Sequence, residues 1–168
     1  MTATLFARTL ASEAMLDVFS DRALVAAMLA FEAALAEGEA AEGIVPASAA
    51  AAIAAATRGE VDVDALVAAA RSAGSLAIPL VKRLTATVAA RDAASAAYVH
   101  HGATSQDVID TAMVLVTKKA LALADSRFFI FLASPDSAQS KWCQRELEFW
   151  IAERPPQTLL IVLTEGTI

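Results

Sequence analysis

In the stretch YVHHGATSQDVIDTAMVLVTKKALALAD, residues 98–125, a polar loop is followed by a long predicted helix. The fold prediction starts from this helix. From about Thr104 to Ala124, apolar residues recur at the three- and four-residue spacing of a helix face. Thr104 is placed to cap this helix, with Asp107 three positions later in a variant of the capping box. The expected apolar side runs through Ile109, Met113, Val116, Ala120 and Leu123.

The residues before this stretch predict further helices, separated by glycine and proline. Alanine is frequent in them and loses no side-chain entropy in a helix. We expect a helix from Ser20 to about Glu42 with Gly43 as its stop, one from Pro46 to near Gly59, one from Asp62 or Asp64 to Gly74, and one from Pro79 to about Asp92.

The character of the sequence changes after Asp125. The runs RFFIFLAS (127–134) and TLLIVLT (158–164) are apolar and rich in β-forming residues, as in strands buried on both faces. Between them, SKWCQRELEFWIAER has a serine cap and helical spacing. The prediction is therefore a mainly α fold followed by one βαβ α/β unit, with domains at 1–125 and 126–168.

Composition narrows the choice of partners and compartment. The 168 residues carry a net charge of −6 with no basic cluster, which makes nucleic acid a poor partner. The longest uncharged run, Gly43 to Thr57, is too short to span a membrane. A single cysteine rules out an internal disulfide. The N-terminal residues contain no long apolar stretch, so a secretory signal is not expected. We expect a cytoplasmic protein.

The start of the long helix carries the first candidate site. We call His100, Thr104, Ser105 and Asp107 the helix-start cluster. A helix N-terminus presents unpaired N–H groups and a partial positive charge, which suit a carboxylate or phosphate. The threonine and serine hydroxyls and the histidine could donate to the same anion. The alternative is that Thr104 and Asp107 only cap the helix, because capping needs no ligand.

Three motifs resemble the fumarase/aspartase superfamily, and within it the bacterial 3-carboxy-cis,cis-muconate cycloisomerases. They are VHHGATSQDVIDTAMVL, SDRALVAAMLAFEAALAEGEAAEGIVP at 20–46 and AGSLAIPLVKRL at 73–84, and the resemblance covers about residues 10–123. It implies that the helix-start cluster contacts the substrate, a small dicarboxylate or tricarboxylate, and that no cofactor or metal is needed. The implied reaction is the reversible lactonisation of carboxymuconate in protocatechuate breakdown.

The resemblance also implies what this chain lacks. Such enzymes continue through a long helical bundle and a loop that carries the general base, and neither has a counterpart here. We therefore expect the chain to be inactive alone, and to work as a homo-oligomer or with a partner that supplies the bundle. Helix faces that would enter the bundle, at Val108, Leu115 and Val116, are expected to be partly exposed or in oligomer contacts.

A second resemblance covers about residues 126–168. A strand ending in Ser-Pro, the SKWCQREL helix start and a strand ending in Thr-Glu-Gly are similar to the middle of a bacterial TIR-like domain. The resemblance implies Glu146 as the catalytic carboxylate of NAD cleavage, with NAD as a substrate rather than a cofactor. The alternatives are that Glu146 is a solvated helix acid and that Cys143 is a small packing thiol.

The two truncated resemblances suggest a chimera that joins near Asp125. Three hypotheses follow: a lyase or cycloisomerase-related chain that needs a missing bundle, a TIR-type interaction or NAD-cleaving module with a helical extension, and a chain without activity of its own.

Overall fold

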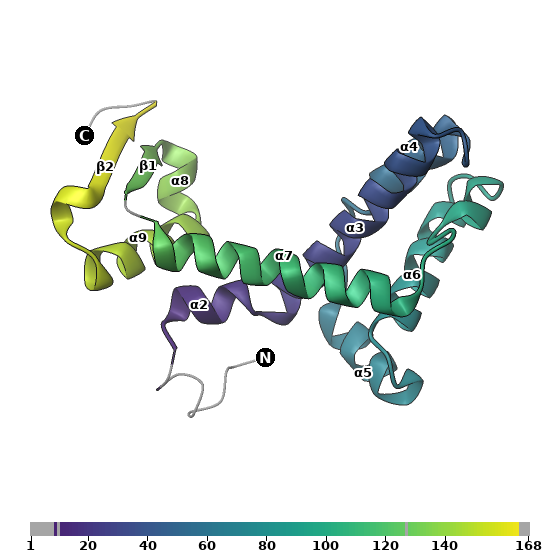
Figure 1. Cartoon of the computed structure of the whole chain (residues 1–168), viewed down its shortest axis with the longest axis horizontal. Coiled ribbons are helices and arrows are strands. Elements are labelled where there is room, and N and C mark those ends of the chain that lie inside the picture. The colour runs from purple at the N-terminus through teal and green to yellow at the C-terminus, as the bar shows by residue number, and fades with distance from the viewer. Residues whose placement is uncertain (1–8, 10, 127, 165–168) are drawn as a thin grey trace. The chain divides into compact units, whose positions relative to one another are not determined.

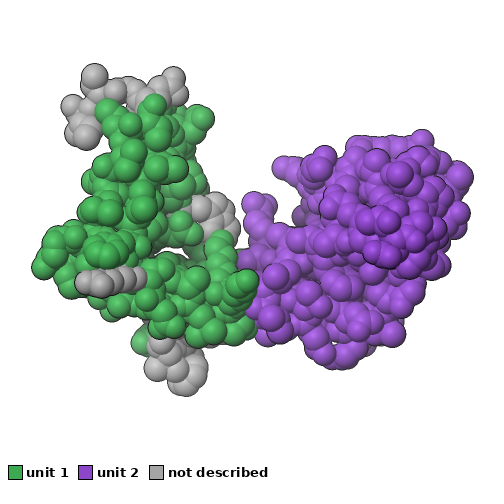
Figure 2. Space-filling model, turned by 45° about the horizontal axis from the view of Figure 1, so that its top comes forward, with its two compact units in different colours: residues 1–20, 117–168 green, residues 21–116 purple. Residues whose placement is uncertain are grey.

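The computed structural model describes residues 9, 11–126 and 128–164. The chain divides into two compact units, residues 21–116 and residues 1–20 with 117–168 (Figure 2). The helical part contains α2 (Glu13–Val18), α3 (Asp21–Ala41), α4 (Ala47–Ala56), α5 (Val63–Ala73), α6 (Ala77–Ala89), the 3-10 helix η1 (Ser95–Tyr98) and α7 (Ser105–Asp125). It is followed by β1 (Phe129–Ala133), α8 (Pro135–Gln139), α9 (Lys141–Glu153), η2 (Pro156–Thr158) and β2 (Leu159–Leu163). The predicted fold class, mainly α with a closing βαβ unit, is confirmed (Figure 1).

Local signals set most helix ends. The Asp62 carboxylate accepts a hydrogen bond from the Ala65 N–H at 3.0 Å, and α5 ends at Gly74 with φ 67°. Helix α6 begins at Ala77, two residues earlier than expected, because the Ser75 hydroxyl accepts from the Ala77 N–H at 3.2 Å. Pro79 then lies in the first turn, where its missing N–H leaves no intrahelical bond unmade.

The core of the 21–116 unit forms where α3 meets its neighbours. One cluster joins α3, α5, α6 and the start of α7: Val25, Met28, Leu29, Leu66, Ala77, Leu80, Val108 and Ala112. A second cluster joins α3, α4 and α6: Ala36, Ala50, Ile53, Ala56, Leu84 and Val88. Its members on α3 and α4 include Ala36, Ala50 and Ala56, whose small side chains let the backbones of these two helices lie close together (Figure 1).

The buried stripe of α7 agrees with the expected one at Val116 and Ala120 and differs from it nearer the start of the helix. It runs through Val108, Ala112, Val116 and Ala120, while Met113 is 43% exposed. The expectation that Val108 and Val116 are exposed was therefore wrong, and only Leu115, at 41%, is exposed as expected. Residues that repeat every four positions lie along one line on a helix. The buried line passes through Val108 and Ala112, each one residue before the predicted Ile109 and Met113.

The βαβ unit is a two-stranded parallel sheet in which Phe129 pairs with Leu159 and Ala133 with Leu163. Trp150 of α9 is 1% exposed, stacks on Phe129 with ring centroids 5.5 Å apart, and donates from Nε1 to the Thr158 hydroxyl at 2.9 Å. The strands are not buried on both faces as expected, since Ile130, Leu132 and Leu160 to Leu163 are exposed. The described strands have no further strand beside them, which leaves these side chains uncovered.

The helix α8 was not expected. Ser134 and Ser137 cap it reciprocally, each hydroxyl accepting from the other residue's N–H, and Pro135 occupies its first position. Within the described part of the chain, every helix is too short or too polar to cross a membrane.

Candidate functional site

The helix-start cluster lies where α7 begins, at Ser105. The Asp107 carboxylate accepts from the Thr104 N–H at 2.7 Å and from the Thr104 hydroxyl at 2.8 Å, and the Asp107 N–H donates back to that hydroxyl at 3.3 Å. These bonds form the predicted capping arrangement. They hold the pKa of Asp107 below its ordinary value, first through the Thr104 N–H, then through its hydroxyl, with a smaller contribution from His100.

His100 contacts a buried acid that was not among the predicted site residues. Its Nδ1 lies 2.6 Å from Oε1 of Glu32, whose side chain is fully buried on α3. Burial raises the pKa of Glu32, while the proximity of His100 opposes that rise. Glu32 lies between Leu29 and Ala36 on the buried stripe of α3, and a glutamate at a core position is itself a signal of a partner.

A second pair lies two helical turns along α3. Glu39 Oε1 is 3.1 Å from Nδ1 of His101, and this pair is more exposed than the first. Gly102 follows with φ 67°, and a β-carbon there would lie 3.4 Å from Glu39 Oε1. Glu32 and Glu39 are seven residues apart and so share one face of the helix. The loop thus places two successive histidines against two acids of α3.

The four predicted residues of the cluster have different roles in this geometry. Asp107 and the Thr104 hydroxyl satisfy each other, and Asp107 already supplies negative charge at the positive end of α7. The Ser105 hydroxyl has no hydrogen bond to another described residue and is half-buried. The donors that remain for an anion are therefore the Ser105 hydroxyl, the N–H groups of Ser105 and Gln106 and the Nε2 side of His100, because the Asp107 N–H donates to Thr104.

Glu146 lies on α9 in the other unit. Next to it, Arg145 forms an ion pair with Asp17 of α2, with guanidinium and carboxylate atoms 2.6 Å apart. The space beside Glu146 has a volume of about 30 Å³ and is lined by Ala14, Asp17, Val18, Lys119, Leu123 and Arg145. Sites for small molecules usually measure some 300 to 1,000 Å³. Cys143 on the same helix is half-buried.

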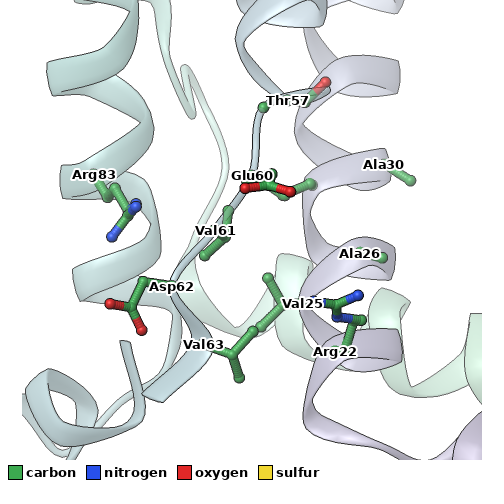
Figure 3. Close-up of a pocket in the computed structure, with 12 residues that line it drawn as sticks. Arg22, Val25, Ala26, Ala30, Thr57, Glu60, Val61, Asp62, Val63 and Arg83 are labelled. Carbon is green, nitrogen blue, oxygen red and sulfur yellow. The ribbon is translucent and has the colours of Figure 1, made fainter. Parts of the chain in front are cut away.

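A cleft of the 21–116 unit lies away from the helix-start cluster. It measures about 770 Å³ between α3, the loop after α4, and α6, and Figure 3 shows Arg22 and Arg83 on opposite walls. Glu60 and Asp62 line it from the loop between these helices, and Val25 and Leu29 are among its apolar lining residues. No residue of the helix-start cluster lines this cleft, and its charged side chains are exposed.

Comparison with known proteins identifies relatives for most of the chain. It is 51% identical over 123 residues to the 3-carboxy-cis,cis-muconate cycloisomerase of Bradyrhizobium diazoefficiens, covering 73% of this chain and 27% of the relative. The crystal structure of the 3-carboxy-cis,cis-muconate lactonizing enzyme from Pseudomonas putida matches with a TM-score of 0.66 and 46% identity, over 73% of this chain and 28% of that one. The chain therefore spans about a quarter of the length of these relatives.

A shorter match supports the second resemblance. Over 46 residues, 27% of this chain and 6% of the relative, the chain is 44% identical to an NAD(+) hydrolase of Actinoplanes. Residues 7–127, by contrast, match the family model described as lyase, and they make up most of the sequence. On the strength of that match, this chain belongs to the lyase family.

Proposed function

We propose that the helix-start cluster binds a carboxylate group of a small dicarboxylate or tricarboxylate, as one wall of a site of the carboxymuconate cycloisomerase type. The observation that carries the proposal is the buried Glu32–His100 pair beside the N-terminus of α7. It places a histidine whose Nδ1 is already occupied next to a helix end with N–H groups to donate. The 3-carboxy-cis,cis-muconate cycloisomerase of Bradyrhizobium diazoefficiens is named for a carboxylated muconate, which has the charge that such a wall requires.

The roles follow from the donors that remain free. Ser105 and the first N–H groups of α7 receive one carboxylate, and His100 donates to the same group from Nε2. Asp107 keeps Thr104 in place and, being negative, directs the ligand toward Ser105 and His100 rather than toward the cap. Lactonisation also needs a general acid or base acting on the carbon skeleton. We assign that group to a segment outside this chain, supplied by a partner, and we expect no turnover by the chain alone.

A binding measurement tests this proposal. Tricarballylate, an unreactive tricarboxylate, is titrated into the full chain while the amide signals of Gly102, Ser105 and Asp107 are followed by NMR. We expect these signals to shift, and tricarballylamide, which lacks the charges, to leave them unchanged. Ser105→Ala should weaken binding about tenfold, the worth of one hydrogen bond to a charged group. Ser48→Ala, a serine in the first turn of α4, is the matched control. Equal effects of the two variants would refute the site.

A second candidate function rests on the match to the NAD(+) hydrolase. We propose that residues 126–168 are a TIR-like fragment, joined near Asp125 to the lyase-type part, with Glu146 at the position of the catalytic acid. The space of about 30 Å³ beside Glu146 does not admit a nucleotide. We therefore expect no NAD loss at high protein concentration. NAD loss abolished by Glu146→Ala, but not by Glu148→Ala on the same helix, would put this function first.

A further inference from the structure

We propose that Glu32 is a positioning residue for His100: the two side chains share one proton, which keeps Nε2–H of His100 available as the donor to a carboxylate at the start of α7. This inference rests on the proposed function, because it names the group that makes the helix-start cluster attract an anion. It also makes carboxylate binding depend on pH through a residue that does not touch the ligand.

Burial of Glu32 is the first support. Its side chain is fully buried, Oε1 meets only His100, and Oε2 has no hydrogen-bond partner among the described residues. A carboxylate with one unpaired oxygen away from water strongly disfavours its ionised form unless an opposite charge or a proton neutralises it. The pair therefore holds one proton more than a separate carboxylate and a neutral imidazole would.

The position of that proton does not alter the outcome at Nε2. If the proton is on Glu32, its hydroxyl donates to Nδ1, and the neutral ring must carry its hydrogen on Nε2. If the proton has moved to the ring, Nδ1–H donates to the carboxylate and Nε2 is again protonated. Only the buried pair with a net negative charge, which burial disfavours, would leave Nε2 as an acceptor.

The backbone of His100 is the second support. With φ 57°, it is the one residue other than glycine with a positive φ in the described ranges. A side chain is held in this conformation only where its surroundings over-determine it, and such residues gather at functional sites. Here the left-handed turn, followed by Gly102 at φ 67°, brings the imidazole onto α3 while the loop continues to Ser105.

The charged groups around the pair act in a consistent direction. Glu39, on the same face of α3, raises the pKa of Glu32 further, in addition to the larger effect of burial. His101 is engaged with Glu39 rather than with Glu32. Asp107, at the start of α7, is the remaining acid influenced by His100, and its negative charge also favours a proton on the pair.

The test compares variants of the full chain at Glu32 and at Glu39. The chain has two histidines, so the ring ¹⁵N signals of His100 and His101, which distinguish a nitrogen that carries hydrogen from one that does not, are assigned by NMR with His101→Gln. In the natural chain, the Nε2 signal of His100 should show a bound hydrogen at about pH 7.5, whichever partner holds the shared proton. In Glu32→Leu, Nδ1 has no partner to select the tautomer, so tricarballylate should bind about tenfold more weakly at that pH but nearly equally at about pH 5.5, where an ordinary imidazole carries both hydrogens. Glu39→Gln, the control at the second pair, keeps the Glu32–His100 contact, so it should change the His101 signals most and leave the hydrogen on Nε2 of His100.

Each outcome decides between the inference and the proposed function. An unprotonated Nε2 at about pH 7.5 in the natural chain overturns the inference even if Glu32→Leu fails to fold. Unchanged pH dependence of tricarballylate binding in Glu32→Leu also overturns it, while leaving the proposed function standing. If the His100 signal behaves as expected but no tricarballylate binds, the shared proton is supported and the proposed function is refuted.

Discussion

The buried stripe of α7 can be tested with one substitution made at two places. Val108 is fully buried in the core of the 21–116 unit, whereas Val114, six residues along the same helix, is 64% exposed. Val108→Ala removes two buried methyl groups, worth about 0.8 kcal/mol each, and leaves a small cavity. The burial cost is therefore about 2 kcal/mol. Alanine is the better helix former by about 0.6 kcal/mol, but this gain is the same at both positions.

We expect Val108→Ala to lower the free energy of unfolding by about 1.5 kcal/mol, and Val114→Ala to raise it by about 0.5 kcal/mol. Urea unfolding followed by far-ultraviolet circular dichroism, which reports the helices, measures both. Both tryptophans, Trp142 and Trp150, lie in the unit formed by residues 1–20 and 117–168, so fluorescence follows that unit separately. Changes that agree within about 0.5 kcal/mol would show that Val108 does not belong to a packed core.

Four further predictions concern the cap, two titrating groups and the βαβ unit. Thr104→Val should cost about 1 kcal/mol in urea unfolding through the lost cap, while Thr87→Val, at a half-buried threonine of α6 that caps no helix, should cost less. The folded-state pKa of Asp107 is lowered, so the stability that its carboxylate adds is present above its unfolded pKa and is lost as pH falls through the folded value. In Asp107→Asn, the free energy of unfolding should not show this loss on acidification. The folded-state pKa of Glu32 is raised, so its contribution is present at low pH and lost as pH rises through the folded value, and Glu32→Gln should flatten this decline in urea unfolding. Trp150→Ala should destabilise its unit by about 3 to 5 kcal/mol in hydrogen exchange of β1 and α9, with Ile151→Ala, 58% exposed, as the neutral control.

The candidate site was only partly accessible from the sequence. The start of α7 and the capping of Thr104 by Asp107 are local, since three residues separate the partners, and they were predicted. Glu32 and Glu39 were missed because the contacts that give them a role span 68 and 62 positions. A glutamate on a buried stripe was the available sign, but nothing in the spacing pointed to histidines so far along the chain.

Two further differences have the same cause. The sequence of α7 shows a helical repeat of apolar residues, but two adjacent lines of residues along the helix fit that repeat. Packing against α3 and α6 buries the line through Val108 and Ala112. The apolar runs of β1 and β2 predicted strands correctly, but the burial of a strand depends on the elements that lie beside and above it. Here the described sheet has two strands. Trp150 covers Phe129, while Ile130, Leu132 and Leu160 to Leu163 remain exposed.

The sequence by itself determined the helices, the βαβ unit and the family resemblance, because caps, glycine stops, hydrophobic spacing and motifs act over a few residues and need no distant partner. Only the tertiary structure decided which face of α7 is buried, how exposed the strands are and which acids hold the two histidines. These depend on side chains far apart in sequence coming together, and burial then sets the energy of each group, including the raised pKa of Glu32 next to His100.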